Sequence, residues 1–225
     1  MVKLLSEADH EKVSRAIAAA EAKSDGEILA VVTEQSDAYH DVALHWAILV
    51  LIAVLAWFAA FPHSLEYYFD FILGGWQPEP LLGQLLTLLM VIAVLKFTVS
   101  LLILKWRRLR IFLTPPGTKQ RRVRRRAVSL FKTATEARTV GRTGVLIYLS
   151  ILERRAEIVA DKAIHDVVPE EQWGDAMAAM LADVKQDQPA DGIVAAIEQV
   201  GAILAEHFPK SASDTNEIPD KLIEL

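Results

Sequence analysis

The chain has 225 residues, a formal net charge of −5 and 52% hydrophobic residues, so its mean hydropathy is positive, which is unusual for a soluble domain of this length. It contains no cysteine, which excludes disulfides, cysteine-based zinc sites and thiol catalysis. Its first forty residues are charged and polar, and this predicts that no cleavable signal peptide is present.

The first forty residues predict one helix and one strand. Ser6 is the expected N-cap of the helix, with Asp9 three residues later completing a capping box. The helix is expected to end at a turn over residues 24–26, where Gly26 would adopt a left-handed conformation. Residues 27–33 (EILAVVT) are typical of a buried strand.

Two apolar segments follow, over residues 43–61 and 81–104. The first has no Asp, Glu, Lys or Arg, and the second has only Lys96. A helix of about 20 apolar residues spans the hydrocarbon core of a bilayer, so the two segments predict a transmembrane hairpin. An ionisable residue inside a membrane is a candidate functional residue, and the alternative is that Lys96 extends toward the headgroups.

The charges beside these segments predict the membrane topology. Residues 62–80, expected to form a loop, contain acids but no Lys or Arg, whereas residues 105–126 contain ten Lys or Arg and no acid. Positively charged flanks stay in the cytoplasm, so we expect an inner (cytoplasmic) membrane protein with both termini cytoplasmic.

The basic segment is expected to contact anionic lipid headgroups, because it follows a span directly and few aromatic residues are interleaved in it. Nucleic acid is the less favoured partner. The residues expected at the membrane surface are Lys105, Arg107, Arg108, Arg110, Arg121 and Arg122.

The remaining sequence predicts three helices and two strands. They are an amphipathic helix over 121–138, strands over 145–150 and 155–160, helices over 169–186 and 191–207, and a mostly extended tail over 208–225. The short connection between the two strands favours an antiparallel pair.

The order of these elements predicts the fold class. Without the hairpin, a strand–helix–strand unit remains, whose two strands should be parallel. The expected architecture is an α/β domain with a small mixed sheet covered by helices. The expected parts are the first part of the domain over 1–42, the hairpin over 43–104, the second part over 105–210, and a C-terminal tail over 211–225.

Several short stretches resemble the TPM domain family, also called TPM phosphatase or the thylakoid lumen eighteen-kilodalton-protein fold, in its bacterial membrane-anchored branch. They are LSEAD at 5–9, GEI at 26–28, RTGVLI at 142–147, EIVAD at 157–161, GAILAEHFP at 201–209 and NEIPD at 216–220. The resemblance implies an α/β/α sandwich, and it implies the weak acid phosphatase activity and divalent-cation binding attributed to some plant members. Many members have a Gly-aromatic-Gly stretch after the third strand, where this chain has ADKA at 160–163.

One cluster after the third strand is a candidate metal site. Asp161, His165 and Asp166 could together hold a hard cation such as Ca²⁺ or Mg²⁺, and the alternative is a solvated loop that caps the next helix. Acidic residues after the first strand, such as Glu34 and Asp37, could approach this cluster. No catalytic residue can be assigned, since Ser150 lacks the Gly-x-Ser-x-Gly context of a nucleophile.

These observations predict a membrane protein whose cytoplasmic TPM-like domain acts as an interaction or assembly module with an unidentified protein partner. The alternative is a divalent-metal-dependent phosphatase of the TPM type. A channel or transporter subunit is a third reading, and it would need a homo-oligomer because two helices cannot enclose a polar path.

Overall fold

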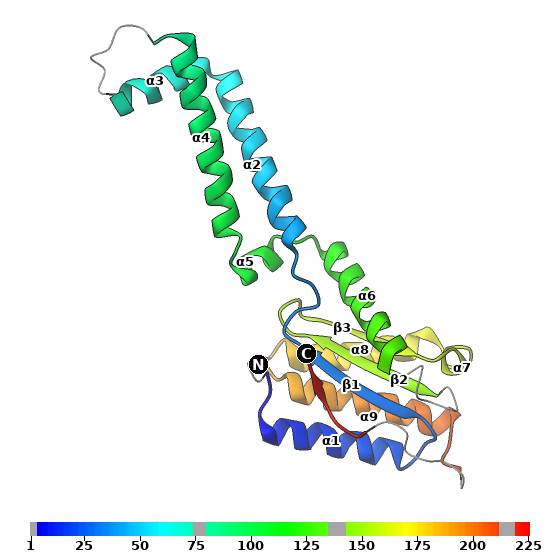
Figure 1. The fold of residues 1–225 in the computed structure, drawn as a ribbon. Coiled ribbons are helices and arrows are strands. Elements are labelled where there is room, and N and C mark those ends of the chain that lie inside the picture. Colours follow the sequence, from blue (N-terminus) through cyan, green and yellow to red (C-terminus); the bar gives the residue numbers. More distant parts are fainter. Residues whose placement is uncertain (1–3, 74–79, 135–142, 212–218) are drawn as a thin grey trace. The chain divides into compact units, whose positions relative to one another are not determined.

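The computed structural model describes the chain except for residues 1–3, 74–79, 135–142 and 212–218 (Figure 1). It contains two compact units. Residues 1–38 and 116–225 form one, here called the α/β domain, and residues 39–115 form the other, here called the hairpin unit. The expected boundaries followed residues 42 and 104, whereas the structure includes residues 105–115 in the hairpin unit and the C-terminal residues in the α/β domain.

The α/β domain contains a four-stranded mixed sheet in the order β3-β2-β1-β4. β1 (Glu27–Thr33) is parallel to β2 (Gly144–Ser150), and β2 is antiparallel to β3 (Arg155–Ala160). These strands and their directions confirm the sequence-based predictions. The predicted extended tail ends in an unforeseen strand, β4 (Ile223–Glu224), which is parallel to β1.

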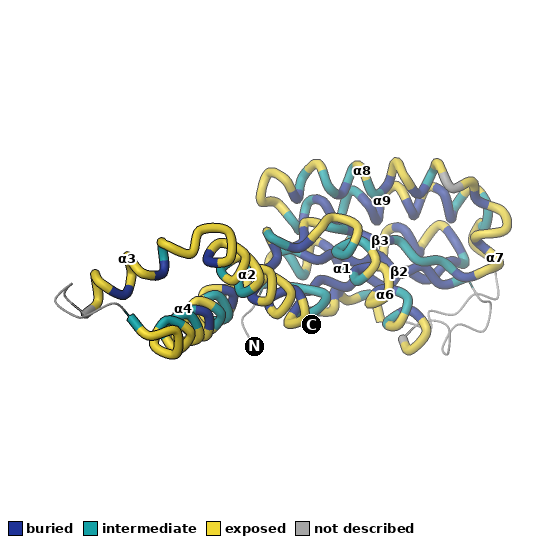
Figure 2. The backbone as a smooth tube through the Cα atoms, turned by 90° about the horizontal axis from the view of Figure 1, so that it is seen from above, coloured by how far each residue is buried: buried dark blue, intermediate teal, exposed yellow. Residues whose placement is uncertain are grey.

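Helices cover both faces of this sheet. The helices of the domain are α1 (Glu7–Glu21), α6 (Pro116–Ala134), the short α7 (Lys162–His165), α8 (Glu170–Val184) and α9 (Pro189–His207). Alternate residues of each strand face opposite sides. One set, such as Ile28 and Val145, packs in a core with α1, α8 and α9, and the other, such as Leu29 and Leu146, packs against α6. This explains why β1 and β2 are buried along their whole length. The outer helix α8, by contrast, alternates between buried and exposed residues (Figure 2).

Local sequence features set several helix ends. The Ser6 hydroxyl accepts the Asp9 N–H at 3.2 Å, and the Asp9 carboxylate accepts the Ser6 N–H at 3.0 Å, which confirms the capping box. α6 begins at Pro116, five residues before the predicted start, because proline is tolerated in the first turn of a helix. Its predicted end at residue 138 lies outside the described residues.

Gly26 does not have the left-handed conformation that was predicted. The α1 C-cap, Ala22, is right-handed helical. A Cβ at Gly26 would instead lie 2.8 Å from Leu204 Cδ1 on α9. A side chain at this position would therefore require the Leu204 side chain to shift, and the backbone dihedral angle of Gly26 imposes no restriction.

The C-terminal residues join the domain through β1 and α1. The Leu225 N–H donates to the Val32 carbonyl at 3.0 Å, and the Thr33 hydroxyl donates to the Leu225 carbonyl at 3.1 Å. The Glu224 carboxylate accepts the N–H groups of Leu4 and Leu5 at 3.1 and 3.0 Å. The last residues therefore tie the edge of the sheet to the start of α1.

The hairpin unit consists of α2 (His40–Ala60), α3 (Pro62–Leu73), α4 (Leu82–Ile103) and α5 (Arg107–Phe112). The prediction of a loop was wrong for residues 62–73, which form α3. Leu65 and Phe69, one helical turn apart, are buried on one side of α3, while Glu66 is exposed. This amphipathic pattern explains the helix.

Candidate functional site

The carboxyl ends of β1 and β2 lie at the same edge of the sheet, because the two strands are parallel and Thr33 pairs with Ser150. The segments that follow the strands continue this pairing. The Ile151 N–H donates to the Thr33 carbonyl, and the Leu152 N–H donates to the Glu34 carbonyl, each at 3.0 Å. In α/β folds, this edge is where ligands most often bind.

A buried carboxylate organises this edge. Glu153 accepts the Ser36 N–H with both carboxylate oxygens, at 2.9 and 3.2 Å, and it accepts the Ser150 hydroxyl. The Ser36 hydroxyl lies 2.9 Å from the Tyr148 hydroxyl. Burial raises the pKa of Tyr148 to about 12, so its hydroxyl keeps its proton at neutral pH. We call Ser36, Tyr148, Ser150 and Glu153 the Glu153 network.

Basic side chains flank the Glu153 network. Arg122 on α6 forms a 3.1 Å ion pair with Asp37, which follows β1. Burial, followed by the nearby Arg155 guanidinium, lowers the pKa of Lys119. Arg155 donates to the Gln120 side chain at 2.8 Å. These contacts connect the first turns of α6 to the loop after β1 and to β3.

The polar side chains at this edge hydrogen-bond to one another. The Ser150 hydroxyl is fully buried and donates to Glu153. The Glu153 carboxylate is used by an N–H and a hydroxyl donor, which hold the loop after β1 against the β2–β3 turn. The Glu153 network therefore fixes the segment from which the chain leaves the domain toward the hairpin unit.

The predicted metal ligands lie at the opposite edge of the sheet. Asp161 is buried, and its carboxylate accepts the Gly144 N–H at 2.9 Å, while His165 and Asp166 are exposed. Within the described ranges, no group of three His, Asp or Glu side chains is arranged to hold a metal ion. The interpretation of this cluster as a metal site therefore continues to rest on sequence spacing alone.

The idea that Glu34 and Asp37 approach Asp161 was wrong. Both follow the carboxyl end of β1, whereas Asp161 follows β3, which runs antiparallel to β2 and ends beside Gly144. A seven-residue strand at about 3.3 Å per residue separates the two edges by roughly 20 Å.

Comparison with known proteins finds one family match and one similar fold. Residues 109–203 match the family model of the TPM domain. No curated protein matches the chain. The NMR structure of the BA42 protein from the psychrophilic bacterium Bizionia argentinensis is similar in fold, with a TM-score of 0.57 and 19% identity over 100% of this chain and 98% of that chain.

The match to the TPM domain covers α6, β2, β3, α7, α8 and most of α9. It begins after the apolar helices and does not include α1 or β1, although both belong to the same compact unit. The resemblance noted in the sequence is thus confirmed for residues 109–203. The motifs at 5–9, 26–28 and 216–220, and residues 204–209 of the motif at 201–209, lie outside the match.

The basic residues near the start of the TPM domain differ in their surroundings. Lys105, Arg107, Arg108 and Arg121 are exposed. Arg110 is buried, with its Nη1 atom 3.5 Å from His40 Nδ1, and Arg122 pairs with Asp37. The six residues predicted at the membrane surface therefore do not form one uniformly open basic patch.

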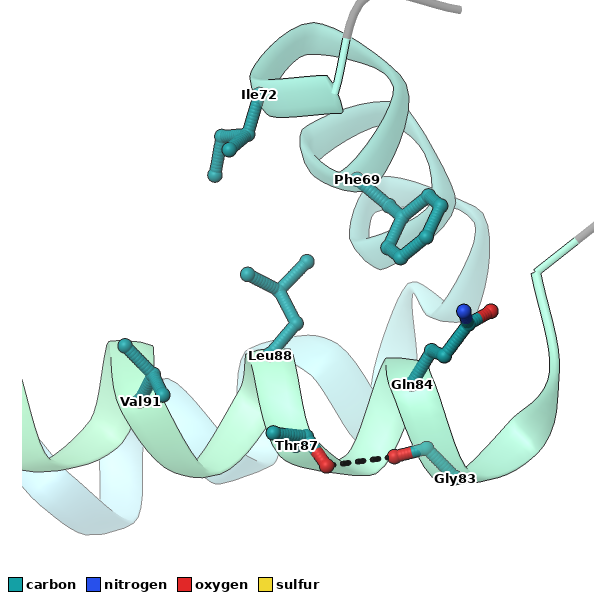
Figure 3. A pocket seen from close by; sticks show the side chains of 7 residues that line it. All are labelled: Phe69, Ile72, Gly83, Gln84, Thr87, Leu88 and Val91. Atoms are coloured by element: carbon teal, nitrogen blue, oxygen red, sulfur yellow. Dashed lines mark hydrogen bonds between the residues drawn. The ribbon is translucent and has the colours of Figure 1, made fainter. Parts of the chain in front are cut away.

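A cavity of about 400 Å³ lies in the hairpin unit, outside the TPM domain match (Figure 3). Phe69 and Ile72 of α3 and Leu88 of α4 point toward one another across it. The Thr87 hydroxyl donates to the Gly83 carbonyl at 2.8 Å, and Gln84 Oε1 accepts the Leu81 N–H at 3.0 Å. The polar groups beside the cavity are thus engaged within α4, so the cavity presents apolar surface.

Proposed function

We propose that the chain is an integral membrane protein in which the hairpin unit anchors the TPM-type domain, and that this domain acts as an interaction or assembly module. The observation that carries the proposal is the exposure of α2 and α4. They have 21 and 22 residues, and each is long and apolar enough to cross a membrane. Side chains such as Ile52, Trp57 and Leu95 are more than half exposed, unlike those of a core helix in a soluble protein.

Charge supports one orientation. The segment between the apolar helices carries Glu66 and Asp70, and the segment after α4 carries Lys105, Arg107 and Arg108. Under the positive-inside rule, α3 is extracytoplasmic, and the α/β domain and both termini are cytoplasmic. The exposed basic residues then lie where anionic headgroups are available.

The absence of native cysteine allows a direct test of this topology. Single substitutions Glu66→Cys on α3 and Arg125→Cys on α6 both replace exposed side chains. We expect a membrane-impermeant maleimide to label Glu66→Cys in intact cells and Arg125→Cys only after permeabilisation. The reverse pattern would overturn the orientation, and recovery of the protein in the soluble fraction after an alkaline wash would overturn the membrane anchor.

A phosphatase assay distinguishes the proposed interaction module from the alternative function, a metal-dependent phosphatase. The Glu153 network supports the module, because its groups are occupied by structural contacts. We expect no metal-dependent turnover of a phosphate ester by the purified protein, and we expect a protein partner to be captured by cross-linking in the cell. Turnover that requires Mg²⁺ or Ca²⁺ and is lost in His165→Ala or Asp166→Asn would establish the phosphatase, since both side chains are exposed and can be replaced without disturbing the fold.

A further inference from the structure

A groove of about 540 Å³ runs along the hairpin unit between α2, α3 and α4. Its lining is apolar and aromatic, with Trp57, Phe58 and Tyr68 among the lining residues, and it contains one cation, Lys96. It shares Ile72 with the cavity in Figure 3. A groove of this size is in the range that holds a small ligand or part of a chain.

Lys96 is the charged group in this groove, and no described residue forms an ion pair with it. Its backbone carbonyl accepts the Ser100 hydroxyl at 2.8 Å, which leaves the ammonium uninvolved. A charged side chain in the interior of a bilayer is unfavourable unless it reaches an opposite charge or water. An anion beside the Lys96 ammonium meets this requirement.

The position of Lys96 along α4 shows where that anion can come from. Lys96 lies seven residues before the end of α4 at Ile103, which is about 10 Å at the helical rise of about 1.5 Å per residue. Long basic side chains near the ends of membrane helices are stabilised by the polar groups of the headgroup region. Trp57, which also lines the groove, lies three residues before the end of α2 at Ala60.

We propose that this groove is a binding site for an anionic phospholipid, whose phosphate pairs with Lys96 and whose acyl chain lies along the groove toward Trp57. The inference deepens the proposed function and rests on insertion of α2 and α4 in a membrane. Charge complementarity selects this occupant, because one cation at the headgroup end of an apolar groove matches one phosphate followed by a hydrocarbon chain.

Trp57 provides the measurement, because bromine atoms on an acyl chain quench tryptophan fluorescence on contact. The full chain is placed in mixed micelles with brominated phosphatidylglycerol or brominated phosphatidylcholine, and the Trp57 signal is the difference between the wild type and Trp57→Phe. We expect half-quenching at a mole fraction of phosphatidylglycerol about fivefold lower than that of phosphatidylcholine. This ratio corresponds to the attraction between one lysine and one anionic lipid, which is about 1 kcal/mol.

The variants assign this preference to Lys96. Lys96→Gln should abolish it and Lys96→Arg should keep it. Lys105→Gln, which removes an exposed lysine just beyond α4 and outside the groove, is the matched control and should also keep it.

Equal quenching by the two lipids in the wild type would overturn the site and indicate ordinary annular lipid. Trp57 shielded from both lipids in a stable dimer would also overturn it and place a second copy in the groove. Failure of the protein to enter micelles at all would instead overturn the membrane anchor.

Discussion

At the scale of single residues, the most unusual group of the α/β domain is Glu21, at the end of α1. Its side chain is buried, and Oε1 accepts the Ile28 N–H of β1 at 2.8 Å. Burial, together with the nearby carboxylates of Glu27 and Asp220, raises the pKa of Glu21 to about 8, although the Ile28 N–H acts to lower it. The residue is therefore protonated in the folded domain at neutral pH.

This predicts a pH-dependent stability. In the unfolded chain Glu21 loses its proton near the ordinary pKa of 4.5, whereas the folded chain keeps it up to about pH 8. The contribution of Glu21 to the free energy of unfolding is thus complete below pH 4.5. It is lost as the pH rises toward 8, at up to about 1.4 kcal/mol per pH unit. Urea unfolding followed by the fluorescence of Trp173, in the core of the domain, measures this slope.

Replacement of Glu21 separates its effect from that of other groups. Glu21→Gln keeps an acceptor for the Ile28 N–H without an ionisable proton, so we expect a shallower slope between pH 5 and pH 8 and a gain in stability above pH 8. Glu11→Gln, on the exposed side of the same helix, is the control and should leave the slope unchanged. A Glu21→Gln variant with the wild-type slope would show that other groups cause the pH dependence.

At the scale of elements, the packing of α8 on α9 depends on Gly192. A Cβ at this position would lie 2.5 Å from the Met180 carbonyl oxygen, and backbone cannot move aside as a flexible side chain can. We expect Gly192→Ala to destabilise the domain by about 1–3 kcal/mol through overpacking. Gly174→Ala on α8, where a Cβ meets nothing within 4 Å, should instead stabilise it by up to about 1 kcal/mol through helix propensity.

The measurement is the urea midpoint of each variant. Shifts of the urea midpoint in opposite directions would indicate the close approach of α8 and α9, because both substitutions replace Gly by Ala within a helix. If Gly192→Ala were as stable as the wild type, the two helices would be packed less closely than the structure shows.

The elements that the sequence predicted best are those that its local patterns determine. β1 and β3 have the predicted bounds, since runs of buried β-branched residues between turns are typical of strands. β4 was missed because two residues make no pattern, and only hydrogen bonds to β1 define it. α5 and α7 were missed because six and four residues are too few to show helical periodicity.

The Glu153 network could not be predicted for a different reason. It joins Ser36, after β1, to Glu153, after β2, and more than a hundred residues separate them in the sequence. Their contact depends on the register Thr33 to Ser150, which no local pattern specifies. The basic residues of α6 were recognised, but the pairing of Arg122 with Asp37 depends on the same register.

At the scale of the whole molecule, the hairpin unit interrupts one folded domain. β1 pairs with β2 along its full length, although residues 39–115 lie between them in the sequence. The two cores of the α/β domain consist of residues from both parts of that domain, with no residue of the hairpin unit. The physical basis for independent folding is therefore present in the α/β domain itself.

This makes the hairpin unit removable. The 3.1 Å ion pair between Asp37 and Arg122 shows that the ends of the interruption are close, since Arg122 lies six residues, or about 9 Å of helix, after Pro116. A linker of about eight Gly and Ser residues, with a root-mean-square span of roughly 16 Å, can therefore join residue 38 to residue 116.

We expect the shortened protein to be soluble without detergent and to unfold cooperatively, as followed by circular dichroism and by Trp173 fluorescence. Val123→Asp in the same protein, which places a charge in the fully buried core beneath α6, is the control and should abolish the transition. An aggregated or unfolded shortened protein would mean that the α/β domain requires the hairpin unit to fold, and not only to be anchored. Cooperative folding would instead show that the two cores of the domain are sufficient for folding. β1 could then pair with β2 through any linker long enough to join residue 38 to residue 116.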